Sequence, residues 1–441
     1  MDQILYQWQM NPTTWVYMSS MIMIAVYFKF NRVWSVRNLD LLALIAMAPG
    51  PLLVAQGGNL AQLGYGWLFA TGGFFLIRLL ADPMMVRRPL LEPNLSPGGL
   101  TFTGAALLLF LMTNVIASDL TVDDLDGPRR ADHILSRQEA PVGEPQLAMH
   151  GPGYPLLHLL ASVPSRALIR LPTQMSEDQE QLMYHTATAR TMAILSHLAV
   201  VIGIIVVGSR HYGNLRTGVA AATLYLLLPY TFQMVGRVDH VLPAALLVWG
   251  VAAYRRPLIA GMLLGLAIGA VYYPVFLLPL WLSFYWQRGR IRFIAGVLAM
   301  IGVLLLSLAL TSSNFDSFLV QARGMFTWPG DVREHVDGFW SFTEPAYRIT
   351  AATMFVVLCC SFALWPARKN LGTLLSCSAA VMLGTQFWHG QGGGLYIAWY
   401  LPMLLLTIFR PNLEDRVALS VLGESWLTRR RSQVRSIERA A

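Results

Sequence analysis

The sequence predicts an all-α fold, a polytopic bundle of transmembrane helices. Hydrophobic residues make up 55% of the 441 residues and charged residues only 13%, which is too apolar for a single core surrounded by water. The apolar residues fall in runs long enough to cross about 30 Å of hydrocarbon. The basic residues lie between these runs, so the net charge of +8 reflects membrane topology and does not indicate nucleic-acid binding.

About thirteen apolar runs have the length of a membrane span. The first begins after Pro12, and it lacks the basic segment and the cleavage site of a signal peptide, so we expect it to be retained as a span. The cysteines lie inside apolar runs, which argues against disulfides and against a cysteine metal site. The expected spans begin near Thr13, Leu39, Gly64, Gly99, Thr191, Gly218, Val241, Leu258, Pro274, Phe293, Ile349, Leu371 and Leu395.

Basic clusters lie on alternate connections between the expected spans. Because positively charged loops stay in the cytoplasm, this alternation places the N-terminus outside and the C-terminus inside a cytoplasmic (inner) membrane that the chain crosses many times. The basic tail 410–441 also suits contact with anionic lipid head groups. The clusters are Lys29, Arg32 and Arg37; Arg87 and Arg88; Arg210 and Arg216; Arg255 and Arg256; Arg288, Arg290 and Arg292; Arg368 and Lys369; and the tail from Arg410.

Two long connections, 118–185 and 312–348, face outward in this topology and hold most of the acidic residues. Loops carry function more often than the elements that they join. Within the first loop, the apolar segment 156–171 contains prolines and suits an interfacial or re-entrant helix. The segments 258–271 and 274–286 are short for spans and are bounded by proline, which is tolerated only where such segments line a cavity inside the protein.

Acidic residues open the first outer loop directly after an expected span. If the helix continues for one turn, Asp119 and Asp123 share a face. A carboxylate at the membrane boundary is partly desolvated, which raises its pKa and suits a general base. The alternative is an acidic helix exit that only caps the helix and meets water, and we favour that alternative for Asp124 and Asp126.

A second charged cluster, Arg237 with Asp239, lies at the end of an expected short span. An ionisable group at the membrane costs roughly 2.5 to 3.5 kcal/mol on insertion scales, so such a group indicates a functional site. The alternative is a pair whose charges cancel at the level of the head groups.

The first outer loop returns to the membrane through a turn with two glycines and two prolines between His150 and Pro155. This composition makes a rigid turn that allows the backbone to approach closely, with His150 and Tyr154 as its polar side chains. The turn suits the wall of a substrate cavity, although Gly-Pro turns are also ordinary breaks between elements.

Aromatic residues and histidines are interleaved in the outward-facing segments, among them Trp388, His389 and His240. Tryptophan stacks on the apolar faces of sugars, and polar neighbours pair with their hydroxyl groups. The same residues suit an aromatic belt at the membrane interface. No pair of histidines has the helical spacing of metal ligands, and we expect neither a metal nor a cofactor.

The segment Gly236–Trp281 resembles integral-membrane glycosyltransferases of the GT-C class, in particular the polyprenyl-phosphate-mannose-dependent enzymes of glycosyltransferase family 87. The shared pattern is a glycine and an aspartate before a short apolar segment, a basic turn with proline, Ala-Gly-x-x-x-Gly, and a proline before the next apolar segment. The residues that match are Gly236, Asp239, Arg255, Arg256, Pro257, Ala260, Gly261, Gly265 and Pro274.

This resemblance implies a GT-C-like core over 99–409, preceded by a three-span extension over 1–98 and followed by the tail 410–441. It places Asp119 where the family has its catalytic aspartate. The chain departs from the family at two positions, with Val271 in place of a lysine and Arg237 in place of a glutamine. The cation near the donor phosphate has then either moved to Arg237 or been lost. The donor-phosphate site expected from the resemblance comprises Arg237, Asp239, Tyr272 and Tyr273.

The resemblance implies an inverting hexosyltransferase, a mannosyltransferase if the family's sugar is kept. It would transfer a sugar from a polyprenyl-phosphate donor to a glycan or lipid acceptor at the outer membrane face. Two other readings stay open: a transporter or flippase for an amphipathic substrate, and a catalytically inactive membrane scaffold. Transporters of that type show matched broken helices in two halves, and the sequence has no second copy of the 257–274 hairpin.

The alternating basic loops generate a test of topology. Reporter domains fused after Arg88 and after Arg216 are expected to score as cytoplasmic, because both positions belong to basic connections. Alkaline phosphatase and green fluorescent protein fusions measure this directly. An external signal at either position would move the first acidic loop to the wrong side of the membrane.

Overall fold

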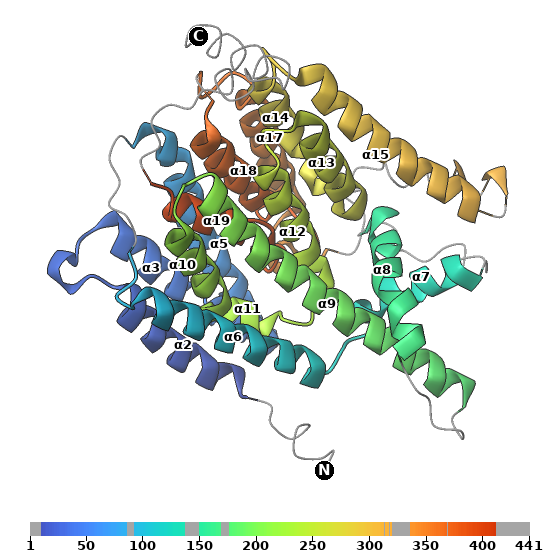
Figure 1. Cartoon of the computed structure of the whole chain (residues 1–441), viewed down its shortest axis with the longest axis horizontal. Coiled ribbons are helices and arrows are strands. Elements are labelled where there is room, and N and C mark those ends of the chain that lie inside the picture. Colours follow the sequence, from blue (N-terminus) through green and yellow to red (C-terminus); the bar gives the residue numbers. More distant parts are fainter. Residues whose placement is uncertain are drawn as a thin grey trace, which may run out of the picture.

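The computed structural model of the chain describes residues 10–85, 92–136, 150–168, 176–312, 314–316, 318–319, 336–367 and 369–411. Most of the second outer loop and the basic tail beyond residue 411 lie outside these ranges. In the described part of the chain the secondary structure is helical and contains no strand (Figure 1). The all-α class expected from the sequence is therefore confirmed.

The helices follow one another along the chain in this order. They are α2 (Pro12–Tyr27), α3 (Val36–Ala46), α4 (Pro49–Ala55), α5 (Gly58–Ala81), α6 (Pro97–Ala117), α7 (Asp126–Ser136), α8 (Gly153–Leu168), α9 (Glu177–Arg210), α10 (Leu215–Leu227), α11 (Pro229–Gln233), α12 (Val238–Ala252), α13 (Pro257–Val271), α14 (Leu278–Phe284), α15 (Arg290–Thr311), α17 (Pro345–Ser361), α18 (Leu371–Thr385) and α19 (Leu401–Ile408). Short 3-10 turns include η2 (Asp82–Met84), η3 (Asp123–Leu125), η5 (Tyr273–Leu277) and η7 (Ile397–Trp399).

Several helices of the described chain are suited to a bilayer, as the sequence predicts for a multi-pass membrane protein. Five are long and apolar enough to span it, and six shorter apolar helices accompany them. The expected number of about thirteen spans stays a prediction, because helices such as α12 and α13 have fifteen residues, fewer than the ~20 that cross the hydrocarbon alone.

The short apolar helices pack inside the bundle. Most residues of α12 and every residue of α18 are buried. Helices α10 and α12 lie along α9, and α13 lies along α15. A Cβ atom at Gly261 would meet the carbonyl of Phe293, so this glycine lets α15 approach α13 closely. The Ala-Gly-x-x-x-Gly segment thus has a packing role between these two helices.

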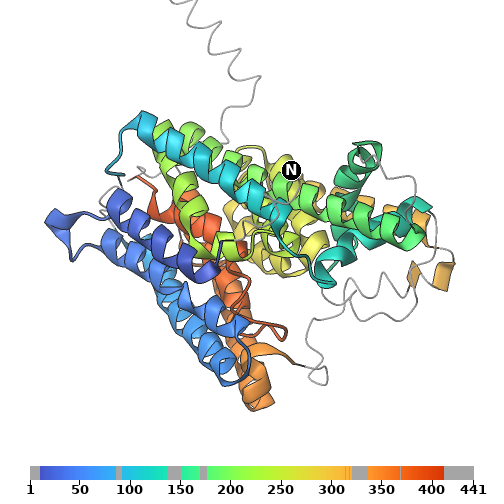
Figure 2. The ribbon, with the colours of Figure 1, turned by 90° about the horizontal axis from the view of Figure 1, so that it is seen from below.

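The N-terminal and C-terminal helices lie side by side. Helix α5 packs against α18, and Figure 2 shows the N-terminal helices beside the orange C-terminal ones, with α7 and α8 projecting at the other end of the molecule. The hydroxyl of Tyr27 on α2 donates a hydrogen bond of 2.8 Å to the carbonyl of Ala220 on α10. The segment before residue 99 therefore packs directly on the remaining helices.

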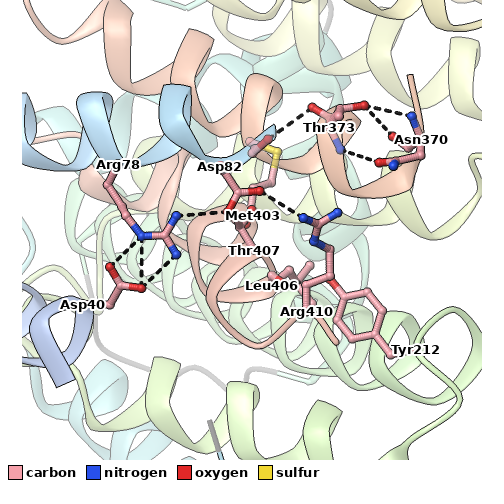
Figure 3. A network of polar contacts seen from close by, with 11 residues as sticks. Asp40, Arg78, Asp82, Tyr212, Asn370, Thr373, Met403, Leu406, Thr407 and Arg410 are labelled. Carbon is pink, nitrogen blue, oxygen red and sulfur yellow. Dashed lines mark hydrogen bonds and ion pairs between the residues drawn. The ribbon is translucent and has the colours of Figure 1, made fainter. Parts of the chain in front are cut away.

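A buried ionic network joins the same ends of the chain (Figure 3). Arg78 on α5 contacts Asp40 and Asp82, each at 3.0 Å, and Arg410 after α19 contacts Asp82 at 3.2 Å. Asp40 and Asp82 are almost fully buried. Two arginines and two aspartates balance one another, which is what burial of charge requires. The network fixes α3 and α5 against the end of α19.

Replacing Asp82 tests this network. Asp82→Asn leaves two arginines facing one carboxylate in a buried site, and removal of one partner from a buried pair costs about 3 to 5 kcal/mol. We expect a lower thermal midpoint for the detergent-solubilised protein, measured by intrinsic fluorescence. Asp178→Asn, on the exposed first turn of α9, is the matched control. Equal midpoints for the two variants would show that the network does not stabilise the fold.

Candidate functional site

Helix α6 ends at Ala117, and the next residue, Ser118, has an extended backbone with φ −70° and ψ 141°. The expected additional helical turn that would place Asp119 and Asp123 on one face is therefore wrong. Another helix fixes the end of α6, because Arg190 on α9 donates a hydrogen bond of 3.0 Å to the Ser118 carbonyl. Asp119 lies in the chain that follows and is exposed, and Asp123 begins η3 and is also exposed.

The two acidic residues expected to meet water, Asp124 and Asp126, are instead buried, so that expectation is wrong. One carboxylate oxygen of Asp124 accepts hydrogen bonds of 2.8 Å from both the backbone N–H and the hydroxyl of Thr121. Asp126 forms an ion pair of 2.9 Å with Arg130. Burial raises the pKa of the Asp124 carboxyl, although the charge of Arg237 acts in the opposite direction.

Arg237 lies between two carboxylates, just before α12. Its Nε and Nη2 donate hydrogen bonds of 3.2 and 3.1 Å to the two oxygens of Asp239, in the forked geometry that arginine favours. Its Nε is also 3.1 Å from Oδ1 of Asp124. That oxygen makes no hydrogen bond, because the Nε–H already points to Asp239. The charge-cancelling pair with Asp239 is present, and Asp124 extends it to a triad.

The triad leaves part of Arg237 accessible. The side chain keeps 28% of its surface exposed, against 5% and 7% for Asp124 and Asp239. In the described part of the chain no residue accepts a hydrogen bond from Nη1. The two carboxylates therefore hold the guanidinium in one orientation and leave one N–H₂ group for a ligand.

Asp119 and Arg237 line the same cavity. It has a volume of about 340 Å³ and lies between the end of α6, the start of α2 and α11. Asp124 and Gln233 also line it, and the Gln233 side-chain nitrogen is buried without an acceptor among the described residues. The cavity thus combines two carboxylates, one arginine and an amide donor. Asp123 and Asp239 are not among its lining residues.

Behind the triad lies a compact group of histidines and aromatic residues. The hydroxyl of Tyr230 is 2.7 Å from Nδ1 of His240, whose Nε2 is 3.7 Å from Asp239. The indole of Trp399 donates a hydrogen bond of 3.0 Å to the Asp239 carbonyl. The ring of His240 also lies 4.5 Å from that of Tyr396. This group holds the backbone and side chain of Asp239 in place.

Three expected site residues belong to this buried group. Tyr273 lies 4.8 Å from His389 and 5.7 Å from Trp388 between ring centroids. Trp388 and His389 are 1% and 5% exposed, so they do not form an aromatic belt at the membrane surface. The cavity beside Arg237 does not include His240, Trp388 or His389 among its lining residues. In the described structure these residues belong to the buried group that holds Asp239 and do not line the cavity.

The return of the first outer loop packs against the end of α13. The Gly151 N–H donates a hydrogen bond of 3.0 Å to the Ala270 carbonyl, and a Cβ at Gly151 would meet the Gly269 carbonyl. The close backbone approach expected from this turn is confirmed. The ring of His150 stacks on that of Tyr154 at 4.2 Å, and a Cβ at Gly151 would lie 3.4 Å from the ring of Tyr272.

Among the described residues no group of three or more His, Cys, Asp or Glu side chains could hold a metal ion. Comparisons with protein-family models, with curated proteins and with solved structures give no match for the chain. We therefore infer the function from the site itself. The site residue that sequence reasoning missed is Asp124, although Thr121 three positions earlier forms the Thr-x-x-Asp pattern of local capping.

The link between Asp124 and Arg237 should hold the start of the outer loop against α12. Asp124→Asn removes the charge that pairs with Arg237. It also weakens the two hydrogen bonds from Thr121, since hydrogen bonds to charged groups contribute about 1.5 to 3 kcal/mol. We expect trypsin to cleave after the exposed Arg129 at least about tenfold faster. The neighbouring Asp123→Asn, at an exposed position, is the control. Equal cleavage rates in the two variants would contradict the anchoring role.

Proposed function

We propose that the protein is a membrane glycosyltransferase. It transfers a sugar from a polyprenyl-phosphate donor to a glycan or lipid acceptor at the outer face of the cytoplasmic membrane. The observation that carries the proposal is the cavity at the end of α6, because Asp119 and Arg237 both line it. A carboxylate and an oriented arginine in one cavity are the two groups that such a displacement needs.

Asp119 is the general base of the proposed reaction. It takes the proton of the acceptor hydroxyl while the acceptor oxygen forms a bond to the anomeric carbon of the sugar. The bond from that carbon to the phosphate oxygen breaks, and the electron pair leaves with the polyprenyl phosphate. Attack opposite the leaving group inverts the configuration. The exposure of Asp119 supports this role because the base must reach a hydroxyl group that arrives from outside.

Arg237 stabilises the leaving phosphate in this proposal. Asp124 and Asp239 already offset its charge, so it acts as an oriented donor through Nη1 more than as an unpaired cation. Such preorganised donors stabilise developing charge without reorganising during the reaction. Asp124 is then a positioning residue, since it contacts Arg237 and fixes the direction of the guanidinium. The arrangement gives a physical reason for arginine at this position, where a lysine would present a point charge.

Asp119→Asn tests the role of the base. General-base catalysis contributes typically ~10² to 10⁴-fold, so transfer of radiolabelled sugar from polyprenyl-phosphate mannose is expected to fall by at least about a hundredfold. Folding should be unaffected because the side chain is exposed. Asp178→Asn is the control with the same chemical change on another exposed residue, and it should keep wild-type activity.

The outcomes separate the readings of the site. A loss of less than about tenfold in Asp119→Asn would reduce this residue to a solvated helix exit. Absence of transfer by the wild-type protein with any polyprenyl-phosphate sugar, together with movement of the lipid between leaflets of a proteoliposome, would replace the enzyme with a flippase.

A further inference from the structure

We propose that helix α2 completes the cavity and seats the hydrocarbon chain of its ligand, with Trp15 as the positioning residue. Helix α2 lies in the N-terminal segment, outside the part of the chain from which the glycosyltransferase resemblance is expected. The inference gives this segment a role in ligand binding. It rests on the proposed function for the identity of the ligand, an isoprenoid chain attached to a phosphate.

The cavity is lined by charged residues in one part and by apolar residues in another. Asp119 and Arg237 are charged, whereas Met10 and Pro12 at the start of α2 and Phe232 on α11 are apolar. A cavity with one charged part and one apolar part fits a ligand that is itself amphipathic. Because the apolar part includes the beginning of α2, the site is incomplete without this helix.

Trp15 fixes the position of this wall. Its ring stacks on Phe110 of α6 at 5.0 Å and on Phe232 at 5.2 Å, with interplanar angles of 29° and 27°. Phe110 and Phe232 are nearly parallel, 6.0 Å apart. The stack connects α2, α6 and α11, and one of its members, Phe232, lines the cavity.

The side-chain amide of Gln233 is a second, independent sign of a ligand. Gln233 lines the cavity, and its side-chain nitrogen is buried without an acceptor in the part of the chain that the structure describes. Buried polar groups ordinarily find a partner. This nitrogen is therefore a further donor, beside Arg237, for the phosphate of the ligand.

The neighbourhood of the wall is open to hydrocarbon. Leu109 and Ile116 on α6 and Tyr17 and Met21 on α2 are exposed apolar side chains. The two helices run along the same side of the bundle (Figure 1), and the Trp15 ring on α2 stacks on Phe110 of α6. A lipid chain can therefore pass from the bilayer to the cavity along these helices, while its phosphate reaches Nη1 of Arg237.

An isoprenoid chain suits this wall better than a saturated acyl chain. Its planar double bonds and methyl branches match the ring of Phe232, the member of the Trp15 stack that lines the cavity, and dispersion contacts of this kind are individually small but add up over a chain. The ionised phosphate matches the fixed donor on Arg237. We therefore commit to a polyprenyl phosphate as the occupant.

Photoaffinity labelling tests the inference without depending on turnover. The full-length protein in lipid nanodiscs is irradiated with a farnesyl phosphate that carries a diazirine on an isoprene unit, and the labelled peptides are mapped by mass spectrometry. We expect saturable labelling of residues 10–17 and of the peptide around Phe232, which undecaprenyl phosphate suppresses. Trp15→Ala should reduce this labelling at least about tenfold, and Trp15→Phe, which keeps an aromatic ring, should retain most of it.

Trp34→Ala is the matched control, because Trp34 is 90% exposed and is not among the residues that line the cavity; it should label like the wild type. Labelling that does not saturate, that is unchanged in Trp15→Ala, or that phosphatidylglycerol suppresses equally would overturn the inference. Labelling as expected in a protein that transfers no sugar would contradict only the proposed enzyme activity. Transfer of sugar without label on α2 would contradict only the role of α2.

Discussion

The pairing of Arg237 with Asp124 and Asp239 is the constraint on which the site depends. A charge at the edge of a bilayer is tolerated when it is paired and hydrogen-bonded, and here the pairing joins two distant parts of the chain. Asp124 belongs to the loop after α6, and Asp239 to the first turn of α12. Where the two parts meet, the end of α6, the start of α2 and α11 enclose a cavity. The ionic contact and the cavity are thus one feature.

A second ionic network joins other helix ends, away from the site. Asp40, Arg78, Asp82 and Arg410 lie beside the end of α5, before α6 begins, and the site lies beyond the end of α6. The network of Asp40, Arg78, Asp82 and Arg410 balances its charges and is almost fully buried, which suits a purely structural role. The triad at Arg237 keeps an accessible N–H₂ group beside Asp119. This difference in exposure separates the group that holds helices together from the group that can meet a ligand.

The sequence predicted the elements better than it predicted the site. Prolines and basic turns marked the starts of α13 and of the 3-10 turn after it, because proline restricts the backbone locally. Burial depends on contacts between distant segments, so the sequence did not show that Asp124 pairs with Arg237 or that Trp388 and His389 pack behind Asp239. Apolar runs also do not distinguish a spanning helix from a short buried one. Asp119 and Arg237, whose roles in one reaction were expected from the resemblance, line the same cavity.

A structure of the protein in a lipid nanodisc with bound polyprenyl phosphate tests the central claim most directly. The account predicts the phosphate within hydrogen-bond distance of Nη1 of Arg237, Asp119 facing the open side of the cavity, and the first isoprene units against Met10, Pro12 and Phe232. A phosphate bound elsewhere, with Arg237 still enclosed by its two carboxylates and the cavity empty, would contradict the account.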